Sequence, residues 1–275
     1  DMGIVLGIDI GGSITKIVGF QGNKKFISAV QVRAEDPVTS AYGAFGKFLK
    51  VNQLNIKDIE KICLTGVGSS HIEDDIFHIK TCRINEFKAI GVGGLALSEK
   101  EEAIVISMGT GTAFIRASKH SNIHLGGSGV GGGTVVGLCS RLANVSSFET
   151  ITELASVGDL SKVDLRISDI SAVSVGSLPS HATASNFGKL KDNATSADLT
   201  LGVLNMTFQT IGMMAVFATR NDTIKDVVLT GTLATMPQTR GIFNVLEELY
   251  GLRFIIPENA IYATAIGAAL AGFRD

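Results

Sequence analysis

The stretch GIDIGGSITKIVGF, residues Gly7–Phe20, decides the fold of this chain. A short apolar strand ends at a single carboxylate, Asp9, and the chain turns at once through Gly11 and Gly12 before β-branched residues resume. Two glycines between two strands predict a tight hairpin turn, because glycine adopts backbone conformations that other residues avoid. We therefore expect a hairpin whose turn presents backbone N–H groups close to a carboxylate.

A second stretch of the same kind, SMGTGTAF (Ser107–Phe114), follows a strongly apolar strand near the middle of the chain. Both halves of the chain thus begin with a strand, a glycine turn and a strand. This repetition predicts an α/β protein with two related domains, residues 1–99 and 100–275, that meet near the charged run Glu99–Glu102. We expect the last helix, about 260–273, to pack back on the first domain.

Turn residues and the spacing of apolar residues predict the other elements. Asn85 is placed to cap a helix. The segment 156–196 is predicted to be an insertion or a cap. The predicted strands are 5–9, 15–20, 25–33, 60–65, 103–108, 112–116, 123–125, 226–230 and 254–256, and the predicted helices are 38–51, 86–98, 132–142, 199–220, 239–250 and 260–273.

Composition limits the classes of function. The chain has 275 residues, 45% of them hydrophobic, a mean hydropathy of +0.32 and a net charge of −2, which indicates a globular protein with a large core. Scattered basic residues and the absence of tryptophan argue against nucleic acid as a partner. No apolar run approaches the ~18 residues that span a bilayer, so we expect no membrane partner. Three scattered cysteines fit a reducing compartment, and the expected location is cytoplasmic.

The glycine turns are predicted to bind phosphate groups, because successive N–H groups in such turns form an anion-binding nest. Lys16 supplies positive charge, and Asp9 is placed to hold a hydrated Mg²⁺ through water. A third glycine cluster precedes a predicted helix, whose N-terminus favours anions. The predicted ATP-binding residues are Gly11, Gly12, Ser13, Lys16, Gly109, Thr110, Gly111, Thr112, Gly131, Gly132, Gly133 and Gly231.

Other interpretations of these patterns remain. Each hairpin taken alone is also consistent with an ordinary turn. The third cluster fits the dinucleotide fingerprint G-x-G-x-x-G at Gly127, Gly129 and Gly132, but no acidic ribose ligand stands out about 20 residues later. The chain contains no G-x-x-x-x-G-K-[ST] stretch, which excludes a P-loop kinase.

The motifs together resemble the superfamily of sugar kinases, heat-shock ATPases and actin, and more closely the type II pantothenate kinases. The resemblance implies two actin-like ATPase domains with a nucleotide cleft between them, ATP and Mg²⁺ as cofactors, pantothenate as the small-molecule substrate, and a homodimer joined through the long helix 199–220. The matching segments are DIGGSITK, NEF (Asn85–Phe87), GTGT (Gly109–Thr112), GGSGVGGG (Gly126–Gly133), SNFG (Ser185–Gly188) and ENAIYATAIGAAL (Glu258–Leu270).

The resemblance also implies roles on the acceptor side. The catalytic base of the family is a glutamate before a phenylalanine at a helix start, and Glu86 matches it. For this residue the alternative is a favourable charge in the first helical turn. The resemblance places Glu86, Thr110, His124 and Gly126 against the acceptor.

Two positions depart from the family pattern. The family carries an arginine where this chain has His124, and a serine after Gly-Thr-Gly-Thr where this chain has Ala113. Histidine offers fewer donors and no permanent charge, and alanine forms no side-chain hydrogen bond. Both changes fall on the acceptor side, so they predict an intact ATP site with an altered acceptor pocket.

Three other functions are compatible with the same fold. A kinase for a sugar or another hydroxy acid is favoured by His124 and Ala113. A nucleotide-binding regulatory protein with little turnover has no need of a base at Glu86. A dehydratase-activating ATPase needs cysteines that bind a cluster, and the three cysteines of this chain are far apart in sequence.

Overall fold

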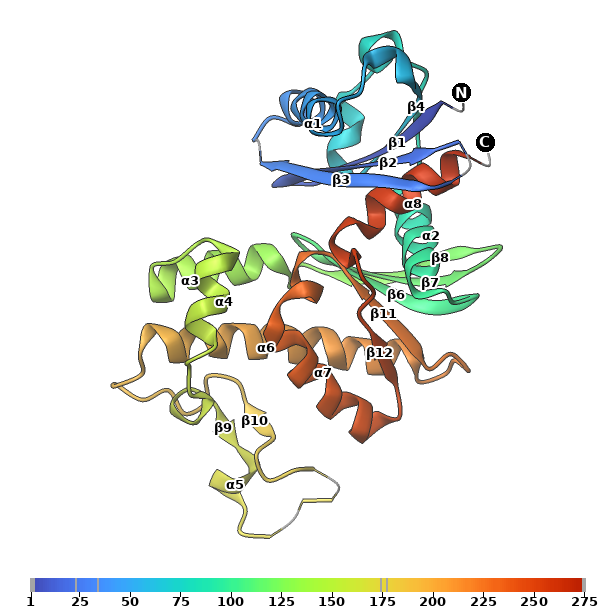
Figure 1. Ribbon diagram of the computed structural model, residues 1–275. Helices are drawn as coiled ribbons and strands as arrows, with labels where there is room; N and C mark the ends of the chain where they lie inside the picture. The colour runs from blue at the N-terminus through green and yellow to red at the C-terminus, as the bar shows by residue number, and fades with distance from the viewer. Residues whose placement is uncertain (1–2, 23, 34, 174, 177, 274–275) are drawn as a thin grey trace.

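The computed structural model of the chain describes residues 3–22, 24–33, 35–173, 175–176 and 178–273. Two five-stranded sheets lie one above the other, with helices between them and on their outer faces (Figure 1). The strands are β1 (Ile4–Ile10), β2 (Ile14–Gln21), β3 (Phe26–Arg33), β4 (Ile59–Thr65), β5 (Thr81–Arg83), β6 (Glu102–Met108), β7 (Thr112–Ser118), β8 (Asn122–Ser128), β9 (Leu165–Arg166), β10 (Thr183–Ser185), β11 (Asp226–Thr230) and β12 (Arg253–Ile255). The helices are α1 (Pro37–Asn52), α2 (Glu86–Ser98), α3 (Gly132–Ala143), α4 (Phe148–Ala155), α5 (Ile167–Ile170), α6 (Ser196–Thr219), α7 (Pro237–Tyr250) and α8 (Ala263–Gly272).

The two large sheets have the same topology. The first has the order β3-β2-β1-β4-β5 and the second has the order β8-β7-β6-β11-β12. In each sheet the first three strands along the chain are antiparallel neighbours, and the other two join as parallel neighbours. The repeated strand–turn–strand pattern in the sequence therefore corresponds to a repeated sheet.

Helices α2 and α8 cross between the two sheets (Figure 1). Helix α2 follows the first sheet along the chain but contacts β6, β7 and β8 of the second, whereas α8 ends the chain and packs on β1, β2 and β4 of the first. The crossing is close because glycines face backbone. A Cβ atom on Gly93 would lie 1.8 Å from the carbonyl oxygen of Ala263, and one on Gly267 would lie 1.8 Å from that of Ala89. The backbones of the two helices therefore touch.

Several boundaries differ from the sequence prediction for physical reasons. Strand β8 extends to Ser128, well past the predicted 123–125, because its ladder with β7 overrides the low strand preference of Gly126 and Gly127. Helix α6 begins at Ser196 rather than 199, since the Thr195 side chain accepts a hydrogen bond from the N–H of Asp198. Helix α4 was not predicted; it has only eight residues.

The segment 156–196 forms an arm, with the β9–β10 hairpin at its centre, that projects beyond α6 (Figure 1). The fully buried Asp164 carboxylate fastens the arm to α6. It accepts hydrogen bonds from Asn205 Nδ2 of α6 at 2.7 Å, from the N–H of Phe187 at 2.9 Å and from Thr183 Oγ1 at 3.1 Å. None of the described residues of this segment lines the large cavity, so the segment is an insertion rather than a cap over that cavity.

The structure corrects one sequence expectation and qualifies another. Cys63 and Cys82 are not scattered, because β4 and β5 pair them side by side with their Sγ atoms 3.5 Å apart. Helix α6 is long and apolar enough to span a bilayer by length and mean hydropathy, although its threonines, glycines and asparagine interrupt any apolar run. Its most apolar window is 56% buried within the protein, and a core helix passes the same test.

Candidate active site

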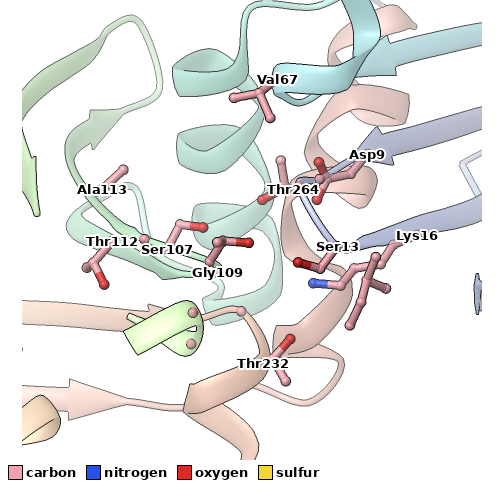
Figure 2. A pocket seen from close by; sticks show the side chains of 18 of the residues that line it. Asp9, Ser13, Lys16, Val67, Ser107, Gly109, Thr112, Ala113, Thr232 and Thr264 are labelled. Atoms are coloured by element: carbon pink, nitrogen blue, oxygen red, sulfur yellow. The ribbon is translucent and has the colours of Figure 1, made fainter. Parts of the chain in front are cut away.

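A cavity of about 740 Å³ opens between the two sheets, and both glycine hairpins line it. Figure 2 places Asp9, Ser13 and Lys16 on one side of the cavity and Ser107 and Thr112 on the other. The structure thus brings together residues that are about 100 positions apart in sequence. The predicted site residues that line the cavity are Asp9, Gly11, Gly12, Ser13, Lys16, Glu86, Gly109, Thr110, Gly111, Thr112, His124, Gly132, Gly133 and Gly231.

Gly126 and Gly131 do not line the cavity. The ladder between β7 and β8 shifts register at Leu125, next to Gly126, which has a φ of +150°. The following residue, Gly127, lines the cavity instead. Gly131 packs against the second glycine turn, where an added Cβ atom would lie 2.7 Å from the carbonyl oxygen of Thr110. Its role is therefore to let α3 approach this turn closely.

The start of α3 is docked on the second glycine turn. The N–H of Gly132 donates to the carbonyl oxygen of Gly109 at 2.8 Å, and the N–H of Gly133 donates to that of Thr110 at 2.9 Å. These two N–H groups already have partners within the protein. The two glycines thus form a surface without side chains along the cavity, which a ligand can approach closely.

Asp9 and Lys16 face each other on neighbouring strands. They are direct partners in the antiparallel register of β1 and β2, which puts both side chains on the same face of the first sheet. Burial raises the pKa of Asp9, and the Lys16 ammonium opposes this rise. Burial likewise lowers the pKa of Lys16, and the Asp9 carboxylate opposes this fall. Each group therefore stabilises the charged form of the other at the cavity wall.

Glu86 is the first residue of α2. The Asn85 side chain caps the helix, as predicted, by accepting hydrogen bonds from the N–H groups of Phe87 at 3.0 Å and Lys88 at 3.2 Å. Burial, and secondly the negative charge of Asp9, raise the pKa of Glu86. A carboxylate whose pKa is raised in this way is a better proton acceptor than an ordinary exposed glutamate.

His124 stacks on Phe87. The two ring centroids are 4.0 Å apart and the ring planes differ by 5°. His124 lies on β8 and Phe87 directly follows Glu86 on α2, so the stack connects the second sheet to the residue beside the carboxylate. The stack fixes the orientation of the imidazole at the cavity wall. The sequence did not predict this contact.

Other residues at the cavity were also missed. Arg33, the last residue of β3, lines the cavity, and so does Thr264. Thr232 also lines it, next to the predicted Gly231. Gly66, directly after β4, does not line the cavity but lies against Asp9, which does. It was missed although the sequence holds a signal for it, since Leu64–Gly66 and Leu229–Gly231 are the same tripeptide, LTG. The remaining missed residues that line the cavity are Ile14, Val67, Ile90, Ser107, Gly127, Ser128, Val136, Gly137, Ser146, Phe148 and Ile261.

A protein-family model named Fumble matches residues 98–240, which is more than half of the chain. The chain belongs to the Fumble family. The matched region of this Fumble protein runs from the end of α2 through the second glycine turn to the beginning of α7.

Curated relatives of this Fumble protein match along nearly their whole length. A type II pantothenate kinase from Bacillus cereus (strain G9842) is 29% identical over 281 residues, which cover 96% of this chain and 97% of the relative. A type II pantothenate kinase from Staphylococcus aureus (strain MRSA252) is 29% identical over 279 residues, which cover 97% of this chain and 99% of the relative.

Solved structures confirm the predicted fold, two related halves of the actin-like ATPase type. Component A of the (R)-2-hydroxyglutaryl-CoA dehydratase of Acidaminococcus fermentans superposes with a TM-score of 0.69 at 19% identity, covering 99% of this chain and 98% of the other. A ROK family glucokinase from Streptomyces griseus, solved with glucose and AMPPNP, superposes with a TM-score of 0.61 at 10% identity. The superposition covers 98% of this chain and 99% of the glucokinase.

Proposed function

We propose that this chain is a type II pantothenate kinase, which transfers the terminal phosphoryl group of ATP to the primary hydroxyl of pantothenate. The names of the curated relatives support the reaction class and the acceptor. The arrangement of the site supports them independently, because two glycine hairpins from equivalent halves face one cavity that also contains a partly buried glutamate. This is the observation on which the proposal rests.

Phosphoryl transfer depends chiefly on positioning and on charge stabilisation. We propose that the turns at Gly11–Ser13 and Gly109–Thr112 hold the polyphosphate from its two sides and that Lys16 balances its charge. Glu86 takes the proton of the acceptor hydroxyl as its oxygen forms the new bond to phosphorus. The bond between that phosphorus and the bridging oxygen breaks, and ADP leaves with the electron pair.

The donor set fits a magnesium ion held largely by ATP. Among the described residues no group of three or more metal-binding side chains occurs, so the protein supplies few ligands of its own. Asp9 offers carboxylate oxygens at the cavity wall, and Mg²⁺ accepts one such ligand together with waters and phosphate oxygens. When bound, the ion would neutralise negative charge on the phosphates.

The proposal includes a homodimer and a cytoplasmic location. The long helix α6 exposes 61% of Phe217, and the arm exposes 62% of Ile170 and 75% of Val173. Such exposed apolar side chains favour burial against a second subunit. Light scattering of the wild type and of Phe217→Glu tests this, because the charge is expected to weaken a dimer through α6. The cytoplasm supplies ATP and keeps thiols reduced.

The decisive experiment is ADP release from MgATP with and without pantothenate, with the product identified by mass. We expect pantothenate-dependent ADP release that Glu86→Gln reduces by 100-fold or more while ATP still binds. Glu101→Gln, a change at an exposed glutamate outside the cavity, is the matched control and keeps full activity. ATP binding without any phosphopantothenate product would contradict the proposal.

A second candidate is a kinase of the same fold for a sugar or another hydroxy acid, since Ala113 and His124 both line the cavity. A panel of hydroxylated acceptors in the same assay distinguishes it. A dehydratase activator is disfavoured because Cys63 and Cys139 are buried, and Cys63 lies beneath α8, where an added Cβ on Gly272 would touch its Sγ.

A further inference from the structure

The strand order gives the cavity two chemically different ends. Arg33 ends β3 at one edge of the first sheet, and Glu86 follows β5 at the other edge. Four strand spacings of about 4.8 Å separate β3 from β5, roughly 19 Å in all. Between them lie Lys16 on β2 and Asp9 on β1. The fixed cations of the cavity thus lie toward one edge, Asp9 lies on the central strand, and Glu86 lies toward the other edge.

The edge of the cavity that carries Lys16 and Arg33 favours binding of the polyphosphate. Lys16 and Arg33 are the lysine and arginine side chains among the described residues that line the cavity. Arg33 forms no ion pair with any other residue that the structure describes. Phosphate groups have a strong preference for such donors. The acceptor is then left with the opposite end, around Glu86.

The acceptor end is apolar and has no fixed positive charge. Beside Glu86 the cavity is lined by His124 and by Ile90, one helical turn further along α2. Phe87 does not line the cavity; its ring stacks on His124 and holds the imidazole in place. Ala113 lines the same cavity, and both Phe87 and Ala113 pack against the apolar cluster that contains Ile90. An acceptor that lies along this wall meets the imidazole ring of His124, two aliphatic side chains and a carboxylate.

We propose that the acceptor of this enzyme is uncharged at its non-reacting end, so that an N-substituted amide of pantothenate is preferred over the free acid, and that His124 determines this preference. The inference rests on the proposed kinase function. A carboxylate on this wall would lose hydration without gaining a fixed counter-charge, in a cavity that already contains Glu86 and Asp9. An amide has no charge to desolvate, and the imidazole, held by its stack on Phe87, offers it a hydrogen bond.

The test compares two acceptors with the same hydroxyl end, pantothenate and its N-pentyl amide, in the wild type and in His124→Arg. We expect kcat/KM of the wild type to be about tenfold or more higher for the amide, and His124→Arg to shift the ratio toward the acid by at least tenfold, since tenfold corresponds to about 1.4 kcal/mol. His120→Arg places the same charge on an exposed histidine outside the cavity and is expected to leave the ratio unchanged. The KM for ATP and the melting temperature establish that each variant folds.

The outcomes separate this inference from the function on which it rests. Phosphorylation of both acceptors with the acid preferred by the wild type would overturn the inference and leave the kinase function standing. An amide preference that His124→Arg does not alter would overturn the role of His124. Phosphorylation of neither acceptor, with ATP bound, would overturn the kinase function and the inference together.

Discussion

Gly66 and Gly231 occupy equivalent places in the two sheets. Each directly follows the parallel strand that neighbours the hairpin, β4 or β11, and their φ angles are +86° and +88°. A Cβ atom on Gly66 would lie 2.5 Å from Asp9 Oδ1, and one on Gly231 would lie 2.4 Å from the carbonyl oxygen of Met108. Each glycine therefore lets one strand end approach the strand that leads into a glycine turn.

Gly231→Ala is expected to destabilise the protein by about 2 kcal/mol or more, because the new Cβ meets backbone and the positive φ strains any L side chain. Denaturant unfolding measures this. Gly43→Ala is the control. Gly43 lies in α1 with open space around it, and alanine there is expected to stabilise the helix by about 0.5–1 kcal/mol. Equal stability of Gly231→Ala and the wild type would refute the argument.

Local sequence signals predicted most of the fold. The glycine turns and the apolar strands before them predicted two equivalent sheets, and Asn85 predicted the start of α2. The missed contacts all depend on residues far apart in the chain. The stack of His124 on Phe87 requires β8 to lie beside α2, and the pairing of Cys63 with Cys82 requires the register of β4 and β5. No local pattern contains that information.

The pH dependence of activity is expected to reflect the environment of Glu86. The base must be ionised, and its pKa is raised by burial and by Asp9, so kcat/KM is expected to fall on acidification at a higher pH than for an ordinary glutamate. Asp9→Asn removes one negative charge, lowers the pKa of Glu86 and shifts this acid limb to lower pH. The position of the limb in a pH–rate profile is the measurement. A limb that Asp9→Asn does not move would exclude this coupling.

Glu86→Gln is expected to increase stability at neutral pH while it abolishes activity. A carboxyl group with a raised pKa in the folded state contributes stability that is present below its unfolded pKa and lost as the pH rises through the folded pKa. Above its folded pKa the ionised Glu86 therefore opposes folding, and the neutral amide removes this cost. Thermal unfolding of both proteins at neutral and at acidic pH tests the sign. The extra stability of Glu86→Gln over the wild type should disappear at acidic pH. A variant that is less stable than the wild type at neutral pH would contradict the prediction.

Lys16→Met is expected to raise the KM for ATP by tenfold or more, because it removes the buried cation that faces the polyphosphate and balances Asp9. Without that ammonium the pKa of Asp9 rises further, since burial then acts unopposed. Lys57→Met, an exposed lysine outside the cavity, is the matched control and keeps the KM of the wild type. Steady-state kinetics with varied MgATP measures both, and an unchanged KM in Lys16→Met would exclude Lys16 from the nucleotide site.

The crossing of α2 and α8 is expected to be the most sensitive point between the two halves. Gly93→Ala and Gly267→Ala each place a methyl group within 1.8 Å of a carbonyl oxygen of the facing helix, so the helices must separate. Because α2 begins at Glu86 and α8 contributes Thr264 to the cavity, separation also displaces the site. We expect a loss of about 3 kcal/mol or more, in the range of severe overpacking, together with lower kcat/KM. Gly241→Ala in α7, where a Cβ meets no atom within 4 Å, is the control and is expected to be at least as stable as the wild type. Wild-type stability in both crossing variants would show that the helices do not depend on this backbone contact.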